Sequence, residues 1–191
     1  MKRDRMAEGI RIFLEGLLDG DDLSRLPGLA EMTSRTPERV AEAWATDLAS
    51  GYGEDPAERL NPQPLEAARG PVVLTNLHFT SICAHHLLPY SGFAHLGFDP
   101  EGGHVGLGAL ARLVSGFARR LTLQEQLTAD IADALHGKIA PRGVLVALEA
   151  EHHCLAARGP RSTGHVFRTL ERRGEPSAAL ERLVLDARRI G

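Results

Sequence analysis

The sequence has few cysteines and no long apolar run. It contains two cysteines in 191 residues, Cys83 and Cys154. No run of about 18 apolar residues occurs, which argues against a membrane-spanning helix. The opening "MKRDRMAEGIRIFLEGLL" mixes charged with apolar residues and does not resemble a signal peptide. We therefore expect a cytoplasmic protein, in which two distant cysteines are more often thiols or metal ligands than a disulfide.

An excess of charge of one sign is also missing. The chain has 22 Lys and Arg residues against 25 Asp and Glu, a formal net charge of −3. This balance gives no reason to expect a nucleic acid or a membrane surface as partner. Hydrophobic residues make up 43% and charged residues 25%, which is typical of a folded globular protein. The length suits one domain, or a core domain with an extension.

The first third of the chain has helical spacing. Residues 3–18 are predicted to form an amphipathic helix that ends at Gly20, from apolar residues at these positions: Met6, Ile10, Phe13, Leu14 and Leu17. Residues 19–35 are a predicted linker. "TPERVAEAWATDLASGYG" predicts a second helix, with Thr36 as N-cap and Pro37 at its first position. We expect a helical extension over 1–53, a linker loop over 54–70 and the main domain over 71–191.

The pattern changes after Pro71. Predicted strands are "VVLTNLHFTSI", "GFAHLGFD", "GVLVALEAEHHCLAA" and "HVFRTLERR". Predicted helices are "LGALARLVSGFARRL", "TLQEQLTADIADALHGKI" and the C-terminal "SAALERLVLDARRI". The order ββααββ over the main domain favours an α+β fold with an antiparallel sheet. "TLQE" also has the pattern of a capping box, with Thr122 as N-cap and Glu125 at the third helical position.

A possible metal site comes from two similar clusters, "ICAHH" and "EAEHHC". Cys83 and His86 form a C-x2-H pair, and Cys154 would supply a third ligand from another strand. Thiolates with an imidazole suit zinc, and three protein ligands leave the open position of a catalytic site. The alternative is that the cysteines are small buried apolar residues, since a lone C-x2-H is a weak signal.

Further histidines accompany this set of ligands. His85 and His152 would be free imidazoles beside the metal, and are candidates for general acid and base. His153 alternates away from His152 on the predicted strand, so we expect it to face the other side of the sheet and to be structural.

Three long motifs resemble the GTP cyclohydrolase I family: "TSICAHHLLPYSGFAHLGF", "GLGALARLVSGFARRLTLQEQLTADIADAL" and "GVLVALEAEHHCLAARGPR". "TPERVAEAW" is similar to the helical extension of that family. The resemblance implies a tunnelling fold, an antiparallel sheet with helices packed on one face, that assembles side by side into a ring, usually a homodecamer. It implies hydrolysis of GTP to 7,8-dihydroneopterin triphosphate and formate, with attack of zinc-bound water on C8 and active sites where subunits meet.

The resemblance also implies roles for individual residues around the metal. It makes Cys83, His86 and Cys154 the zinc ligands. It implies that His85 handles a proton at the ribose ring oxygen, and that His152 delivers a proton at the imidazole ring of the substrate.

Other positions match residues that bind the substrate in the family. The resemblance implies that Glu125 grips the guanine edge, with Gln124 beside it. A carboxylate suits the two adjacent N–H donors of guanine, so Glu125 has a binding role to set against the capping box. The basic residues that match the triphosphate site are Arg39, Arg112 and Arg158.

The chain departs from the family pattern in three places, two of which affect the predicted triphosphate site. Ala84 replaces a glutamate, Gly108 and Ala109 replace a serine and a lysine, and Glu42 stands at a position that is usually basic. Each lost charge-assisted hydrogen bond costs about 1.5–3 kcal/mol, so losing two weakens triphosphate binding by about two to four orders of magnitude. Either other basic residues such as Arg161 substitute, or the chain is a paralogue that acts on a different or less phosphorylated guanine compound.

Two functions of other classes are less consistent with the motifs. A zinc-dependent nucleobase deaminase would show H-x-E followed by P-C-x-x-C, and neither pattern is present. A non-catalytic ring-forming zinc module would be expected to lose His85 or His152, and both are present.

Overall fold

The fold is known from a computed structural model, which describes residues 1–18, 28, 33–64 and 70–187. These residues separate into two compact units, Met1–Ser50 and Gly51–Gly191. Most of the predicted linker over 19–35, the predicted helix end at Gly20 and part of the loop over 54–70 lie outside the described residues. Within the described part, no helix is both long enough and apolar enough to cross a membrane.

The first unit is helical. It contains α1 (Arg3–Leu18), α3 (Thr36–Ala43) and the π-helical turn η1 (Trp44–Leu48). Helix α1 confirms the prediction from apolar spacing. Thr36 is not the N-cap of α3, because Arg35 takes that position and no side chain caps the helix. Ion pairs link α1 to α3, with Arg3 Nη1 lying 2.9 Å from Glu42 Oε2.

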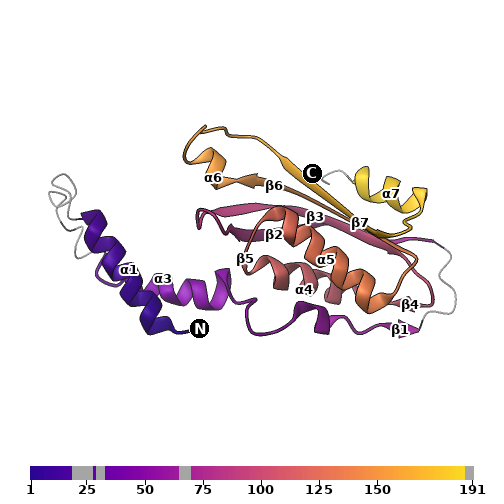
Figure 1. Ribbon diagram of the computed structural model, residues 1–191, viewed down its shortest axis with the longest axis horizontal. Helices are drawn as coiled ribbons and strands as arrows, with labels where there is room; N and C mark the ends of the chain where they lie inside the picture. Colours follow the sequence, from indigo (N-terminus) through magenta and orange to yellow (C-terminus); the bar gives the residue numbers. More distant parts are fainter. Residues whose placement is uncertain (19–27, 29–32, 65–69, 188–191) are drawn as a thin grey trace. The chain divides into compact units, whose positions relative to one another are not determined.

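A five-stranded sheet forms the centre of the second unit, in the order β5-β2-β3-β6-β7 (Figure 1). Its strands are β2 (Val72–Cys83), β3 (Pro89–Asp99), β5 (Leu121–Thr122), β6 (Gly143–His152) and β7 (Phe167–Gly174). All neighbours are antiparallel except β5, which runs parallel to the end of β2. The predicted ββααββ order and the α+β class are therefore confirmed.

The segment before the sheet is more structured than expected. Residues 54–70 were predicted to be a loop, but they contain the 3₁₀ turn η2 (Pro56–Arg59) and the short strand β1 (Gln63–Pro64). Asp55 caps η2, since its side chain accepts a hydrogen bond from the N–H of Ala57. Strand β1 pairs with β4 (Gly103–His104). The pairing of β1 with β4 joins distant parts of the chain, which local residue spacing does not reveal.

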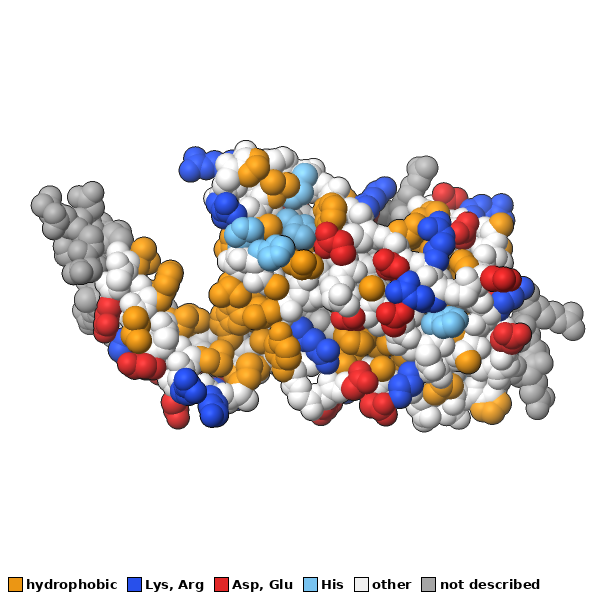
Figure 2. Space-filling model, viewed as in Figure 1, with side chains coloured by type: hydrophobic (Ala, Val, Ile, Leu, Met, Phe, Trp, Pro, Cys, Tyr) orange, Lys and Arg blue, Asp and Glu red, His pale blue; other side chains and the backbone are white. Residues whose placement is uncertain are grey.

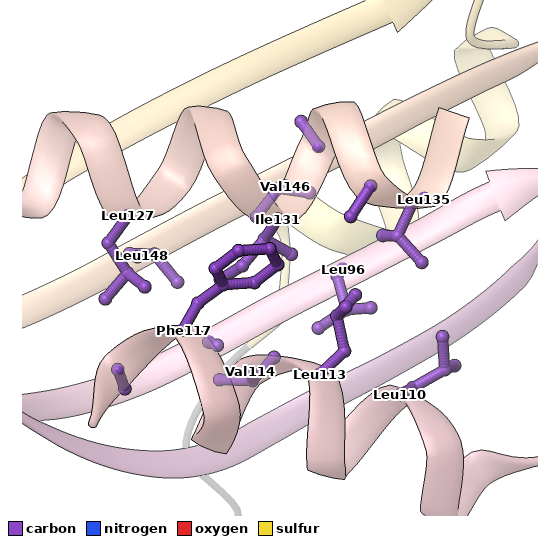
Figure 3. Packing of buried hydrophobic residues seen from close by; sticks show 14 of the residues in the cluster. Leu96, Leu110, Leu113, Val114, Phe117, Leu127, Ile131, Leu135, Val146 and Leu148 are labelled. Carbon is purple, nitrogen blue, oxygen red and sulfur yellow. The ribbon is translucent and has the colours of Figure 1, made fainter. Parts of the chain in front are cut away.

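Two helices cover one face of the sheet. They are α4 (Leu107–Ala118) and α5 (Gln124–Ile139). Figure 3 shows their apolar side chains meeting those of the strands: Leu96, Leu110, Leu113, Val114, Phe117, Leu127, Ile131, Leu135, Val146 and Leu148. Alternation along β6 explains the packing, because Val146 and Leu148 face this core while Leu145 faces the other side.

The opposite face of the sheet carries the C-terminal helix α7 (Ala178–Leu185), whose Leu180 and Val184 pack on Leu145. Buried Asp99 holds the start of this helix, accepting hydrogen bonds from the backbone N–H and the hydroxyl of Ser177 at 2.6 and 2.8 Å. The helix is shorter than predicted from "SAALERLVLDARRI", because Asp186 is its C-cap. Residues 188–190 of that prediction lie outside the described part.

Candidate active site

A tight turn after β2 forms the first half of the site. The N–H of Cys83 donates to the carbonyl of Leu88 at 2.9 Å, and the N–H groups of His86 and Leu87 donate back to the carbonyl of Cys83 at 3.3 and 2.9 Å. Leu87 adopts a positive φ of 55°, a conformation that is unusual for a bulky residue. The turn directs His86 back to the strand end, so that Cys83 Sγ lies 3.9 Å from His86 Nδ1.

The second half of the site comes from the end of β6. This strand pairs with β3, placing His152 opposite Tyr90, and the short helix α6 (His153–Ala156) follows at once. The prediction that the strand continues through His153 is therefore wrong, since β6 ends at His152. The helical turn brings Cys154 to the turn after β2.

Cys83, His86 and Cys154 form a group that could hold a metal ion, and we refer to these three residues as the metal group. Their ligand atoms all lie within 4.8 Å of one another. Zinc bonds of about 2.0–2.3 Å in a tetrahedral arrangement place ligand atoms about 3.5 Å apart, so only a small closure is needed. Burial first, and the neighbouring Cys83 second, raise the pKa of the Cys154 thiol. Two thiols and one imidazole fit zinc, whose charge favours the thiolates.

A pocket of about 290 Å³ lies beside this group. It brings together seven residues that the sequence had indicated: Cys83, His85, His86, Gln124, Glu125, His152 and Cys154. Figure 2 shows histidine side chains gathered on this part of the surface of the second unit. The further lining residues that sequence reasoning had missed include Tyr90, His165 and Phe167.

Contacts on several sides fix the ring of His152. The ring stacks on Tyr90, with centroids 4.6 Å apart and planes inclined by 6°, and meets Phe167 edge-on at 5.6 Å. Its Nε2 lies 2.9 Å from Gln124 Oε1, and its Nδ1 lies 4.0 Å from Cys154 Sγ. Burial, followed by the neighbouring His165, lowers the pKa of His152. A half-buried imidazole is thus held against the metal group in one orientation.

The start of α5 places Glu125 at the pocket. The predicted capping box is wrong, because Leu123 is the N-cap and no side chain caps the helix. Thr122 belongs instead to β5, where it pairs with Cys83. This pairing sets the first turn of α5 beside the metal group. Glu125 is exposed and lines the pocket, where its carboxylate could accept hydrogen bonds from a ligand.

The remaining polar candidates occupy different positions. His85 is exposed, lines the pocket and meets the His86 ring edge-on at 6.1 Å. Arg158 touches the metal group, with Nη1 2.5 Å from His86 Nε2. Arg112 is not among the residues that line the pocket of this chain. Arg39 belongs to the first unit.

Arg112 lies close to Gly108, one of the positions that depart from the family pattern. A Cβ atom at residue 108 would lie 3.2 Å from Arg112 Nη1. The guanidinium of Arg112 therefore lies against the backbone where the family pattern has a serine side chain.

An α+β fold with a Cys-His-Cys group beside a pocket at the strand ends is typical of enzymes that bind a metal ion. The family model for GTP cyclohydrolase I matches residues 21–184. The chain is 44% identical to GTP cyclohydrolase 1 of Leifsonia xyli subsp. xyli over 171 residues, covering 87% of this chain and 86% of that protein. The chain belongs to the GTP cyclohydrolase I family.

Further relatives carry the same name. GTP cyclohydrolase 1 of Desulforamulus reducens is 42% identical over 161 residues, 84% of this chain and 82% of that protein. That of Rickettsia rickettsii (strain Sheila Smith) is 37% identical over 173 residues, 90% and 87% of the two chains. A crystal structure of the archaeosine synthase QueF-Like in the apo form covers 58% of this chain, with 16% identity and a TM-score of 0.48. The family assignment rests on the sequence matches.

Proposed function

We propose that this protein is a zinc-dependent hydrolase that opens the imidazole ring of guanine, converting GTP to 7,8-dihydroneopterin triphosphate and formate. Family membership supports the proposal. The observation that carries it is the group of Cys83, His86 and Cys154 at a pocket that also holds Glu125 and His152. A metal group, a carboxylate for guanine and a positioned imidazole are the parts that this reaction requires.

Zinc is the proposed metal, held by Cys83, His86 and Cys154. Lewis-acid activation of water at neutral pH is the chemistry that zinc supplies in such a site. Cys83 is buried at the end of β2, so this thiol is fixed by the sheet. His86 is exposed, which leaves the metal group accessible from the pocket.

Glu125 is the proposed guanine anchor. Its carboxylate can accept hydrogen bonds from the two adjacent N–H donors on one edge of the base, an arrangement that fixes orientation as well as affinity. Leu123 and Phe167 supply apolar wall to the same pocket. A flat aromatic base fits between apolar walls with one convergent polar group.

Two histidines are proposed to move protons. His152, held between Tyr90 and Gln124 beside Cys154, would serve the imidazole ring of the substrate. His85, exposed on the turn that follows Cys83, would serve the ribose ring oxygen. A positioned general acid or base contributes about 10²–10⁴-fold to a rate.

We propose that the protein is a homo-oligomer, specifically a homodecamer. The five-stranded sheet ends at β7, and β5 pairs with β2 only at Ile82 and Cys83. Long strand edges invite pairing with another chain, and side-by-side pairing of identical subunits closes a ring. Light scattering should give a mass several times 20.7 kDa, and a monomer at micromolar concentration would contradict this part of the proposal.

A second candidate function is the same reaction on a less phosphorylated guanine compound. The residues at the predicted triphosphate site favour it. Ala109 has only 8% of its surface exposed and offers no cation. Glu42 pairs with Arg3, so this position carries an acid with its own partner. Of the proposed phosphate-binding residues in the second unit, Arg158 contacts the metal group, while Arg112 would have to reach a site on a neighbouring subunit.

Product analysis tests the proposal. The zinc-loaded protein is incubated with GTP, GDP, GMP and guanosine, and both formate and the fluorescent pterin formed on oxidation are measured. 8-Oxoguanine is a negative control, because its C8 already carries oxygen and cannot leave as formate. Equal amounts of formate and pterin from at least one guanine nucleotide are expected. Full zinc occupancy without formate from any of the four would overturn the proposed function.

A further inference from the structure

We propose that Gln124 is a positioning residue, which holds His152 in the tautomer protonated at Nε2 and directs its Nδ1 toward the metal group. This assignment rests on the proposed function for its catalytic meaning. It differs from the role in substrate binding that the sequence suggested for Gln124.

The side-chain amide of Gln124 can have only one orientation. The residue is fully buried, with 0% of its surface exposed. Its Nε2 lies 3.2 Å from the carbonyl of Leu148, 3.1 Å from that of Phe167 and 3.1 Å from Thr169 Oγ1. Backbone carbonyls only accept hydrogen bonds. The flipped amide would bury its oxygen against two other oxygens, so the nitrogen must face them.

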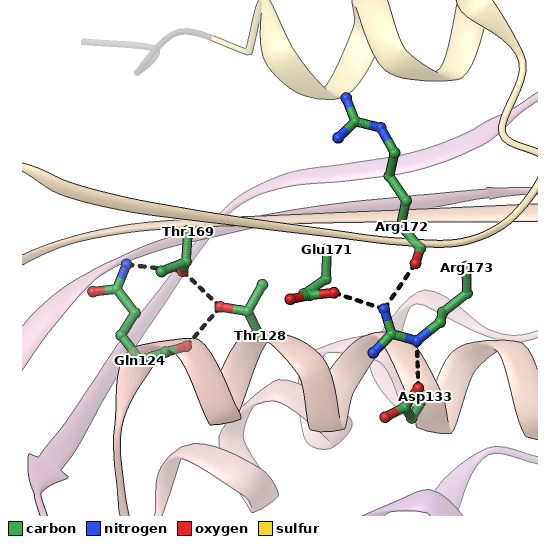
Figure 4. Close-up of polar contacts among 7 residues, drawn as sticks. All are labelled: Gln124, Thr128, Asp133, Thr169, Glu171, Arg172 and Arg173. Atoms are coloured by element: carbon green, nitrogen blue, oxygen red, sulfur yellow. Dashed lines mark hydrogen bonds and ion pairs between the residues drawn. The ribbon is translucent and has the colours of Figure 1, made fainter.

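A closed set of hydrogen bonds among Gln124, Thr128 and Thr169 supports this orientation (Figure 4). The hydroxyl of Thr128 donates to the backbone carbonyl of Gln124 at 2.6 Å, which uses its one hydrogen. In the 2.6 Å contact between the two hydroxyls, Thr169 must then be the donor. The oxygen of Thr169 is left to accept from Gln124 Nε2. Every contact in this set therefore has a hydrogen only when the amide nitrogen faces Thr169 on β7.

The orientation of the amide decides which nitrogen of His152 carries hydrogen. Gln124 Oε1 lies 2.9 Å from His152 Nε2, and an amide oxygen only accepts. Nε2 must therefore be the protonated nitrogen of the neutral ring. Its unprotonated nitrogen, Nδ1, is the one 4.0 Å from Cys154 Sγ. Gln124 thus presents the lone pair of His152 to the metal side of the pocket.

The same contacts leave the side chain of Gln124 no free N–H donor for a substrate. Its two N–H donors serve three protein acceptors, and its oxygen serves His152. A substrate that took one of these N–H donors would have to displace a buried hydrogen bond and leave its protein acceptor unsatisfied.

Nitrogen NMR tests the tautomer without turnover. The zinc-loaded protein is labelled with ¹⁵N-histidine, and the His152 signals are identified by their loss in His152→Phe. Protonated and unprotonated ring nitrogens resonate in separate regions of the spectrum. We expect His152 to show hydrogen on Nε2 and none on Nδ1. Hydrogen on Nδ1, or an even mixture of tautomers, would overturn the proposal.

A pair of matched variants tests the role. Gln124→Met keeps the length of the side chain and removes its hydrogen bonds. Gln126→Met makes the same change on the same helix, at an exposed residue that bonds Asp130. We expect Gln124→Met to keep zinc, to lose the single tautomer and to lower kcat by about 10–100-fold with little change in KM. We expect Gln126→Met to match the wild type.

Other results for Gln124→Met would contradict the proposal. A higher KM in Gln124→Met, with kcat and the His152 tautomer unchanged, would make Gln124 a substrate contact and overturn the proposal. If Gln124→Met does not fold, the tautomer in the wild type decides. Absence of formate from every guanine compound in the wild type would overturn the proposed function, while the spectrum would still report on Gln124.

Discussion

The rings of Tyr90 and His152 lie parallel, 6° apart in inclination with centroids separated by 4.6 Å. The two residues face each other across the pairing of β3 with β6, and Tyr90 is fully buried. The sheet therefore sets the plane of the imidazole that serves the pocket. The orientation of His152 depends on the fold as directly as that of the metal ligands.

The stack predicts a difference between two substitutions at Tyr90. Tyr90→Phe keeps a flat ring against His152 and should retain zinc and most of the turnover. Tyr90→Leu removes the aromatic pair, which alone costs about 0.5–1.5 kcal/mol, and should lower kcat as the imidazole loses its fixed plane. Steady-state kinetics on the folded, zinc-loaded variants decides. Equal kcat in Phe and Leu variants would show that the stack does not matter.

The adjacent histidines after Cys83 predict opposite effects on zinc. His86 belongs to the metal group, whereas His85 only lines the pocket. We expect His86→Ala to lose zinc, and His85→Ala to keep one zinc per chain while turnover falls by about 10²–10⁴-fold. Both side chains are exposed, so neither change should unfold the chain. Measurement of zinc content and of formate release checks this. Loss of zinc in His85→Ala but not in His86→Ala would make His85 the metal ligand and His86 the residue that transfers a proton.

Ala109 and Glu42, at the predicted triphosphate site, predict weak discrimination between GTP and less phosphorylated guanine compounds. Ala109→Lys with Glu42→Lys should raise the ratio of kcat/KM for GTP to that for guanosine by about tenfold or more. The ratio cancels any loss of folded protein, which matters because Ala109 is buried. Ala111→Lys, on the same helix, is the control for an added charge. A wild type that already prefers GTP over GMP by several orders of magnitude would contradict this prediction.

The junction between β3 and α7 predicts a stability effect far from the pocket. Asp99→Ala removes the acceptor for two hydrogen bonds from Ser177. Leaving these half-buried donors without a partner should lower the free energy of unfolding by about 1–3 kcal/mol. Glu101→Ala, at an exposed turn residue, is the control. Urea unfolding at one fixed protein concentration measures both, and equal midpoints would show that Asp99 does not hold α7.

Local apolar spacing predicted several of the helices and strands. Helix α1 and strand β2 follow directly from their apolar spacing. The prediction of a capping box at "TLQE" was wrong because Thr122, in β5, pairs with Cys83 in β2. This contact joins distant parts of the chain. The prediction that His153 lies on a strand was wrong for a similar reason. Strand β6 ends at His152, the last residue that pairs with β3, where the partner is Tyr90.

The candidate site could be predicted where chemistry identifies a residue by type. Cysteine and histidine in two clusters indicated the metal group, and the structure brings Cys83, His86 and Cys154 together. Tyr90 and Phe167 carried no such signal, because an aromatic residue in a strand is ordinary. Gln124 was predicted only to lie beside Glu125 in the substrate site. Only the arrangement of β6 and β7 around it shows that it is buried.

Following the C8 atom of the substrate tests the central claim most directly. GTP labelled with ¹³C at C8 is incubated with the zinc-loaded protein, and the label is followed by carbon NMR. Ring opening at the site formed by Cys83, His86 and Cys154 predicts that the label appears in formate, in step with pterin formation. It also predicts that Cys154→Ser, folded but without zinc, releases none. Label that stays in a purine in the fully zinc-loaded wild type, or labelled formate from zinc-free Cys154→Ser at the wild-type rate, would contradict the account.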